Sequence, residues 1–280
     1  MQHSTVEIAL EYEVKTPTHF CFNVEAALCE GQEILSERLA VSSGVAPRSF
    51  TDEGSGNRFI RFDALPGPLM LNYQADVQVN YVAGGVQLAQ MPVSQVPDAI
   101  FRYLLPTRYC ESDLLSGQAQ QLFGQTEPGM ARVRAVARWV HESIDYRPGT
   151  TTSTTTAREV FMQRTGVCRD FAHLGITFCR ALNIPARLVV GYVWFDEPPQ
   201  DFHAIFEVWL GGRWVLIDPS YMAPVERLVR IGTGRDAKDV AFSTIFGTVQ
   251  MTRKEVRVDE HDAALAVHEQ VQAQQAAEDA

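Results

Sequence analysis

The sequence has few cysteines, and their spacing excludes one class of fold. Only five occur in 280 residues, an odd number, and no two of them form a C-x-x-C pair. Small secreted domains held together by disulfides carry an even, closely spaced set. The sequence therefore argues against a disulfide framework. For Cys21, Cys29 and Cys179 we expect small, buried apolar side chains.

Basic residues and long apolar runs are also scarce. The formal net charge is −10, so electrostatics gives no basis for binding nucleic acid or an anionic membrane. No stretch approaches the ~18 consecutive apolar residues of a membrane-spanning helix. The first ten residues, MQHSTVEIAL, lack the basic and apolar regions of a signal peptide. We therefore expect a cytoplasmic protein without a nucleic-acid or membrane partner, and the sequence leaves its oligomeric state open.

The first third of the chain has the pattern of β-strands. A chain of 280 residues is longer than the usual single domain, which favours two domains. Apolar and polar residues alternate from Thr5 to Val14 and again from Leu69 to Tyr81, as in half-buried strands. Connections rich in Gly, Pro and Ser separate such segments. We predict an α+β protein in which residues 1–92 form an N-terminal antiparallel β-sandwich.

Helical patterns begin after Pro92 and Pro97, where we place the domain boundary. Apolar residues recur on one helical face over residues 130–144, and Thr156 with Glu159 matches a capping box. These patterns place a second domain at residues 98–250. The Thr-rich run before Thr156 is interpreted as a solvated connector, with a wall of the substrate cleft as the alternative. Residues 259–280 hold six acidic residues and no Lys or Arg, which predicts an acidic tail, either a frayed helix or disordered.

One cysteine stands at the start of a predicted helix. Apolar residues follow it at spacings of three and four, the pattern of a buried helix face: Phe171, Leu174, Phe178 and Leu182. Cys168 then falls in the first turn, after Gly166. A free thiol has a pKa of about 8.5, and the unpaired N–H groups and dipole of a helix start favour its thiolate. Cys168 is therefore the candidate nucleophile; Cys110 is its only rival and has no base near it in the sequence.

A histidine and an aspartate follow at the ends of two predicted strands. The segments His203–Leu210 and Arg213–Ile217 flank Gly211-Gly212, a two-residue hairpin signal. If Leu210 lies opposite Arg213, His203 lies opposite about position 220, close to Asp218. The order Cys168, His203, Asp218 supplies a thiol, its base and the carboxylate that orients the base.

Three blocks of sequence carry a family resemblance. GVCRDFAHLGITFCRALNIPAR, DFHAIFEVWLGGRW and DPS occur in that order, after YLLPTRYCESD at Tyr103–Asp113. Over roughly residues 100–220 the chain resembles the transglutaminase-like superfamily of cysteine enzymes, bacterial type with an N-terminal β-rich domain. The resemblance implies a papain-like catalytic domain with a triad at Cys168, His203 and Asp218. It also implies a thioester intermediate, a peptide or protein substrate that could contain glutamine, and an amine as a potential acceptor.

The expected reaction needs neither a cofactor nor a metal. The Cys168 thiolate attacks a carboxamide, His203 protonates the departing amine, and Asp218 holds the imidazole in the useful tautomer. Water or a second amine then resolves the thioester. We take hydrolysis as the default, because nothing in the sequence identifies a pocket for an acceptor amine. The alternative is a catalytically inactive transglutaminase-like module used for protein interaction, with its triad a relic.

The sequence identifies one donor to the oxyanion and assigns structural roles to Trp139 and His173. The backbone N–H of Cys168 is a natural donor to an oxyanion, but the second donor cannot be identified from the sequence. Trp139, the only upstream tryptophan, is interpreted as a packing residue on its helix. His173 is interpreted as a packed or hydrogen-bonded helix residue and not as a metal ligand.

Overall fold

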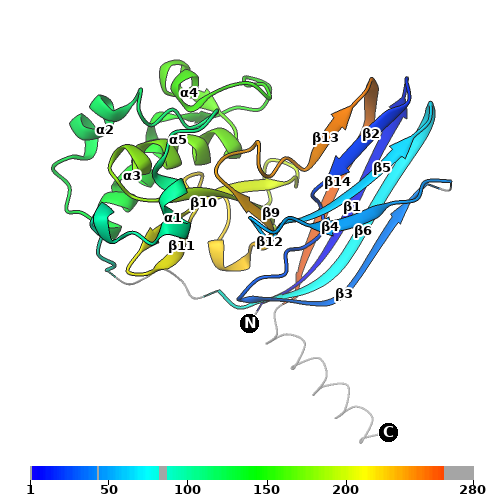
Figure 1. Ribbon diagram of the computed structural model, residues 1–280, viewed down its shortest axis with the longest axis horizontal. Helices are drawn as coiled ribbons and strands as arrows, with labels where there is room; N and C mark the ends of the chain where they lie inside the picture. Colours follow the sequence, from blue (N-terminus) through cyan, green and yellow to red (C-terminus); the bar gives the residue numbers. More distant parts are fainter. Residues whose placement is uncertain (1, 43, 82–86, 262–280) are drawn as a thin grey trace, which may run out of the picture.

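The computed structural model describes residues 2–42, 44–81 and 87–261 of the chain. Strands from both ends of the sequence form a β-rich region, and the middle of the chain forms a mixed helical and β region beside it (Figure 1). Among the described residues, no helix has the length and apolar character needed to cross a membrane.

Two four-stranded antiparallel sheets make up the β-rich region. The first has the order β14 (Val249–His261), β1 (Gln2–Val14), β6 (Gly67–Val79) and β3 (Gln32–Val41). The second has the order β13 (Ser243–Phe246), β2 (Thr18–Phe22), β5 (Arg58–Ala64) and β4 (Arg48–Thr51).

The alternating sequence pattern explains how these sheets fold. In β1 and β6 every second residue is buried, as expected when one face of a strand meets a core and the other meets solvent. Val6 and Leu10 of the first sheet share one hydrophobic core with Phe20 and Phe62 of the second. The rings of Phe20 and Phe62 stack at 5.5 Å. The prediction of a β-rich N-terminal region is therefore confirmed.

The C-terminal strands require a correction to the predicted division of the chain. The sequence assigned residues 98–250 to the catalytic domain and 1–92 to the sandwich. Strand β13 instead pairs with β2, and β14 pairs with β1 from His3 to Val14. Pairings of this kind join residues more than 200 positions apart, and no local pattern reveals them. Of the predicted tail 259–280, Asp259–His261 end β14, and 262–280 lie outside the described residues.

The second region packs helices against a four-stranded sheet (Figure 1). The sheet has the order β11 (Arg213–Ile217), β10 (His203–Leu210), β9 (Ala186–Tyr192) and β12 (Val229–Gly234). The helices are α1 (Asp98–Phe101), α2 (Ser116–Phe123), α3 (Met130–Ser143), α4 (Ala157–Gln163) and α5 (Cys168–Ala181). Short 3-10 turns occupy Val93–Gln95, Arg102–Leu104 and Val225–Arg227, and β7 (Asp145–Tyr146) pairs in parallel with β8 (Thr165–Gly166).

Helix α5 is the central element of this region. It packs on β9 and β10 and is surrounded by α2, α3 and α4, so its residues from Asp170 to Arg180 are all buried. After the helix, Asn183 adopts a positive φ of 61° and Pro185 follows, an arrangement common at the ends of helices. The two regions also share a core, because Tyr192, Val229 and Ile231 of β9 and β12 pack with the β-rich region.

Candidate active site

Cys168 is the first residue of α5, as its place after Gly166 predicts. The residue before it, Val167, is extended, so the backbone N–H groups of the first helical turn lack partners within the helix. The thiol is free and partly exposed. Because the positive end of the helix dipole favours an anion at this position, the site suits a thiolate.

Gly166 allows the chain to pass close to the helix it precedes. A Cβ atom at this position would lie 2.8 Å from the Cβ of Asp170, closer than real side chains approach. Asp170 is fully buried and accepts the N–H of Val167 through Oδ2 at 3.0 Å. A larger residue at 166 would therefore displace the carboxylate that caps α5.

His203 and Asp218 meet where β10 begins and β11 ends. Leu210 lies opposite Arg213, as predicted, and the paired strands carry the two side chains to one edge of the sheet. His203 Nε2 lies 2.9 Å from Asp218 Oδ2. The second oxygen, Oδ1, accepts the N–H of Ser220 at 2.8 Å and its hydroxyl at 2.6 Å. Both oxygens of this buried carboxylate are therefore satisfied.

The His203–Asp218 pair favours a charged imidazole. Burial would lower the pKa of His203, but the hydrogen bond to Asp218 and the neighbouring Cys168 thiol outweigh burial and raise that pKa to about 10. Burial would likewise raise the pKa of Asp218, whereas His203 and Ser220 hold it below its usual range. An imidazolium between a carboxylate and a thiol stabilises the thiolate.

The ring orientation leaves one nitrogen for the sulfur. Asp218 engages Nε2, while Nδ1 of His203 is buried and has no hydrogen-bond partner among the described residues. The Cys168 thiol interacts with the ring and also donates to the carbonyl of Phe202 at 4.0 Å. The three residues singled out from the sequence thus come together, in the order thiol, imidazole, carboxylate.

Tyr146 is a fourth group at the site, and sequence reasoning missed it. Strand β7 pairs with β8 so that Tyr146 lies opposite Gly166, two residues before the thiol. The phenol hydrogen-bonds with the backbone N–H and with the side chain of Cys168, and burial and the nearby sulfur raise the pKa of the phenol. It therefore stays a neutral hydrogen-bond donor at neutral pH. A two-residue strand leaves no periodic signal in the sequence. The one available signal for this contact was the tyrosine itself, just before the Thr-rich run.

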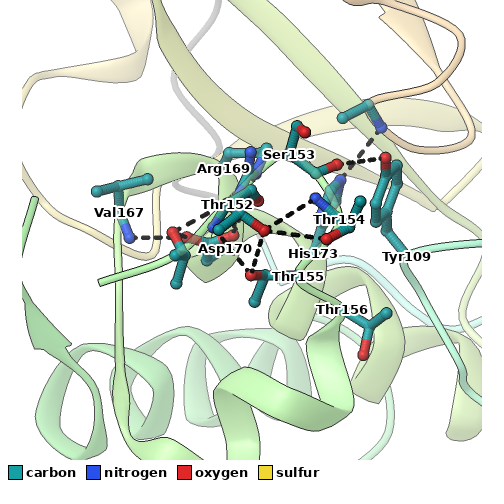
Figure 2. A network of polar contacts seen from close by, with 12 residues as sticks. Tyr109, Thr152, Ser153, Thr154, Thr155, Thr156, Val167, Arg169, Asp170 and His173 are labelled. Atoms are coloured by element: carbon teal, nitrogen blue, oxygen red, sulfur yellow. Dashed lines mark hydrogen bonds and ion pairs between the residues drawn. The ribbon is translucent and has the colours of Figure 1, made fainter. Parts of the chain in front are cut away.

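The Thr-rich loop is attached to the nucleophile helix (Figure 2). The hydroxyl of Thr151 donates to Asp170 Oδ2 at 2.6 Å. Arg169 bridges Asp170 Oδ1 at 2.7 Å and the carbonyl of Thr152 at 2.8 Å. Tyr109 anchors the far side of the loop by donating to the carbonyl of Ser153 at 2.6 Å. The loop was predicted to be a solvated connector; its tip is exposed, but its backbone is held by residues that directly follow Cys168.

The remaining candidate residues are packed or hydrogen-bonded within the fold. Trp139 packs edge-on against Phe178 at 5.4 Å within the helical core. His173 is buried, stacks on Tyr109 at 5.2 Å and accepts the N–H of Ala237 at 3.1 Å. Burial lowers the pKa of His173 to about 4, so it is neutral. Cys110 is fully buried, and burial raises its thiol pKa to about 12, which leaves it unreactive.

Comparisons with protein families match both regions of the chain. Residues 117–219 match the transglutaminase-like superfamily, described as its core. Residues 2–99 match the N-terminal domain of bacterial transglutaminases. The second match stops before β13 and β14, which complete the same two sheets.

Individual relatives agree with these matches. The crystal structure of a candidate cysteine protease from Cytophaga hutchinsonii superposes with a TM-score of 0.89 and 38% identity, covering 94% of this chain and 91% of that one. An uncharacterized protein of Mycobacterium leprae is 33% identical over 157 residues, 52% of this chain and 55% of the relative. An uncharacterized protein of Mycobacterium tuberculosis is 29% identical over 235 residues, 75% of each. The chain thus matches about half the length of the M. leprae relative.

Proposed function

The chain belongs to the transglutaminase-like superfamily, and from this premise we propose that it is a cysteine-dependent enzyme that cleaves an amide or peptide bond through a thioester on Cys168. The observation that carries the proposal is the geometry around His203. Its Nε2 binds Asp218 at 2.9 Å, and the ring also interacts with the thiol at the start of α5. This arrangement can hold a thiolate and an imidazolium side by side.

The proposed reaction has two stages. In the first, the Cys168 thiolate adds to the carbonyl carbon, the tetrahedral intermediate collapses, and His203 gives its proton to the departing amine. In the second, His203 takes a proton from water as the water attacks the thioester, and the sulfur leaves as a thiolate, which releases a carboxylic acid and restores the thiolate–imidazolium pair. Asp218 stays ionised throughout and holds the ring.

Tyr146 is proposed as the second donor to the oxyanion, beside the backbone N–H of Cys168. Tyr146→Phe removes one hydroxyl and leaves the ring in place, so the fold should persist. Loss of one preorganised oxyanion donor costs on the order of 10² to 10³ in kcat. We expect a fall of that size in kcat with a small change in KM, measured with a chromogenic amide. A kcat equal to that of the wild type would remove Tyr146 from the mechanism.

Hydrolysis is proposed as the outcome, ahead of transfer to an amine. Water at ~55 M competes with any amine, so a transferase must bind its acceptor beside the thioester or exclude water. The Cys168 side chain is only partly buried, which leaves the thioester open to water. The test incubates the protein with a glutamine-containing acyl-donor peptide, with and without excess lysine analogue, and identifies products by mass spectrometry. A dominant amine adduct at millimolar amine would show a transferase that uses the same three residues.

The reactivity of the Cys168 thiol distinguishes an enzyme from a catalytically inactive interaction module. An activated Cys168 should react with iodoacetamide much faster than the other four thiols at pH 6 to 7, because only a thiolate attacks the reagent. Peptide mapping of the labelled protein identifies the modified residue. Equal, slow labelling of all accessible thiols would favour the inactive module.

The charge on His203 gives a prediction for pH dependence. The competent ion pair exists below the pKa of His203, which is raised to about 10, so kcat/KM should fall on the alkaline side near that pH. Asp218→Asn removes the hydrogen-bonded carboxylate, which raises the pKa of His203 against the lowering effect of burial. The pKa of His203 should then fall, and the alkaline limb should move to lower pH together with a reduced kcat. An unshifted limb in Asp218→Asn would show that Asp218 does not set the charge of His203.

A further inference from the structure

The residue before His203 is partly buried against the β-rich region. The ring of Phe202 packs against the core of that region and stacks on Phe242, with centroids 4.6 Å apart and an interplanar angle of 16°. Its backbone carbonyl accepts the Cys168 thiol at 4.0 Å. Phe202 therefore connects the β-rich region to the sulfur and, through the next peptide bond, to the imidazole.

The two residues before Phe202 also contact the β-rich region. Gln200 accepts the backbone N–H of Val258 at 2.6 Å, and Asp201 forms an ion pair with Lys254. Lys254 and Val258 both lie on β14, an edge strand of its sheet, and Val258 takes part through its backbone N–H. Three consecutive residues before His203 thus each have a partner in β14 or at Phe242.

These contacts lie on a segment that is not itself part of a helix or strand. No helix or strand covers the segment between Tyr192, the end of β9, and His203, the start of β10. His203 is the first residue of its ladder, opposite Gly191. Side-chain contacts therefore hold the backbone just before the imidazole: the ring of Tyr192 lies 5.5 Å from that of Phe202, and the other contacts come from β14 and Phe242.

We infer that Phe242 and Lys254 are positioning residues, which hold the segment 200–203 so that the imidazole stays aligned with Cys168. This inference rests on the proposed function. A displacement of about 1 Å in such a group can lower a rate about 10²-fold. Both positioning residues lie beyond residue 219, where the match to the superfamily core ends.

The first test replaces the stacked ring. Phe242→Ala should lower kcat by on the order of 10-fold or more and leave KM little changed, because the alignment of the imidazole is lost and not the substrate contacts. The rate of Cys168 carboxamidomethylation at pH 7 should fall with it. The kcat and the alkylation rate are both measured at a temperature at which circular dichroism shows that the variant is fully folded. A loss of stability alone would then change neither rate.

The second test uses the ion pair and a control on the same strand. Lys254→Met should lower kcat by a few fold, since a partly exposed ion pair contributes modestly, and Lys254→Arg should restore it. Arg253 is the matched control: it pairs with Glu11 and Glu255, not with the segment 200–203. Arg253→Met should therefore retain the kcat and the alkylation rate of the wild type.

The outcomes separate this inference from the proposed function. A wild-type protein with neither turnover nor fast Cys168 alkylation contradicts the proposed function. An active wild type whose folded Phe242→Ala and Lys254→Met variants keep full kcat and alkylation rate overturns the positioning role alone. An equal loss in Arg253→Met also overturns it, because β14 would then act only through general stability.

Discussion

Cys168→Ala is expected to abolish turnover while the protein stays folded. The substitution removes the atom that forms the thioester, and loss of a catalytic nucleophile costs on the order of 10⁴-fold or more in kcat. The side chain is small and only partly buried, so little packing is lost. We expect kcat to fall below detection and the thermal midpoint to change by only a few degrees. Hydrolysis of an amide substrate and thermal unfolding by circular dichroism measure the two effects.

Cys21→Ala provides the matched control. Cys21 is a free, partly buried thiol on β2 of the β-rich region, and burial raises its pKa. The variant should keep the kcat of the wild type and should still take up one equivalent of iodoacetamide rapidly at Cys168. Full activity in Cys168→Ala would mean that the site has been assigned to the wrong residue.

His203→Ala is expected to be comparably severe, at roughly 10³-fold or more in kcat, because one ring serves as both acid and base. Removal of the imidazole also takes away the cation that stabilises the Cys168 thiolate, so alkylation at pH 7 should slow as well. Asp218 would keep only Ser220 as a partner while remaining buried, and this should lower the free energy of unfolding by about 1 to 3 kcal/mol. Denaturant titration measures that loss independently of activity.

The chain offers a second histidine–aspartate pair as a control. His19 Nδ1 lies 2.7 Å from Asp63 Oδ1, on paired strands of the β-rich region. His19→Ala therefore breaks a similar pair away from the thiol and should leave kcat and the alkylation rate unchanged. If His203→Ala reduced kcat no more than His19→Ala does, the imidazole of His203 would have no part in the chemistry.

Local signals accounted for the parts of the site that were predicted. The spacing of Phe171, Leu174 and Phe178 marked the buried helix, and Gly166 placed Cys168 at its start. The Gly211-Gly212 turn fixed the β10–β11 register, and with it the meeting of His203 and Asp218. Each of these signals acts over a few residues, since helix periodicity, capping and turn geometry are properties of short segments.

The sequence by itself determined the identity and order of the thiol, imidazole and carboxylate, the two strand patterns at the N-terminus, and the family. Tertiary structure decided where β13 and β14 pair, which tyrosine stands beside Cys168, and which residues hold the backbone before His203. Pairings between segments more than 200 residues apart depend on which strand edges lie side by side in the folded protein, and no local pattern records this. Tyr146 reaches Cys168 through a two-residue parallel pairing, and Phe242 reaches Phe202 through a shared core, so neither contact leaves a repeat in the sequence.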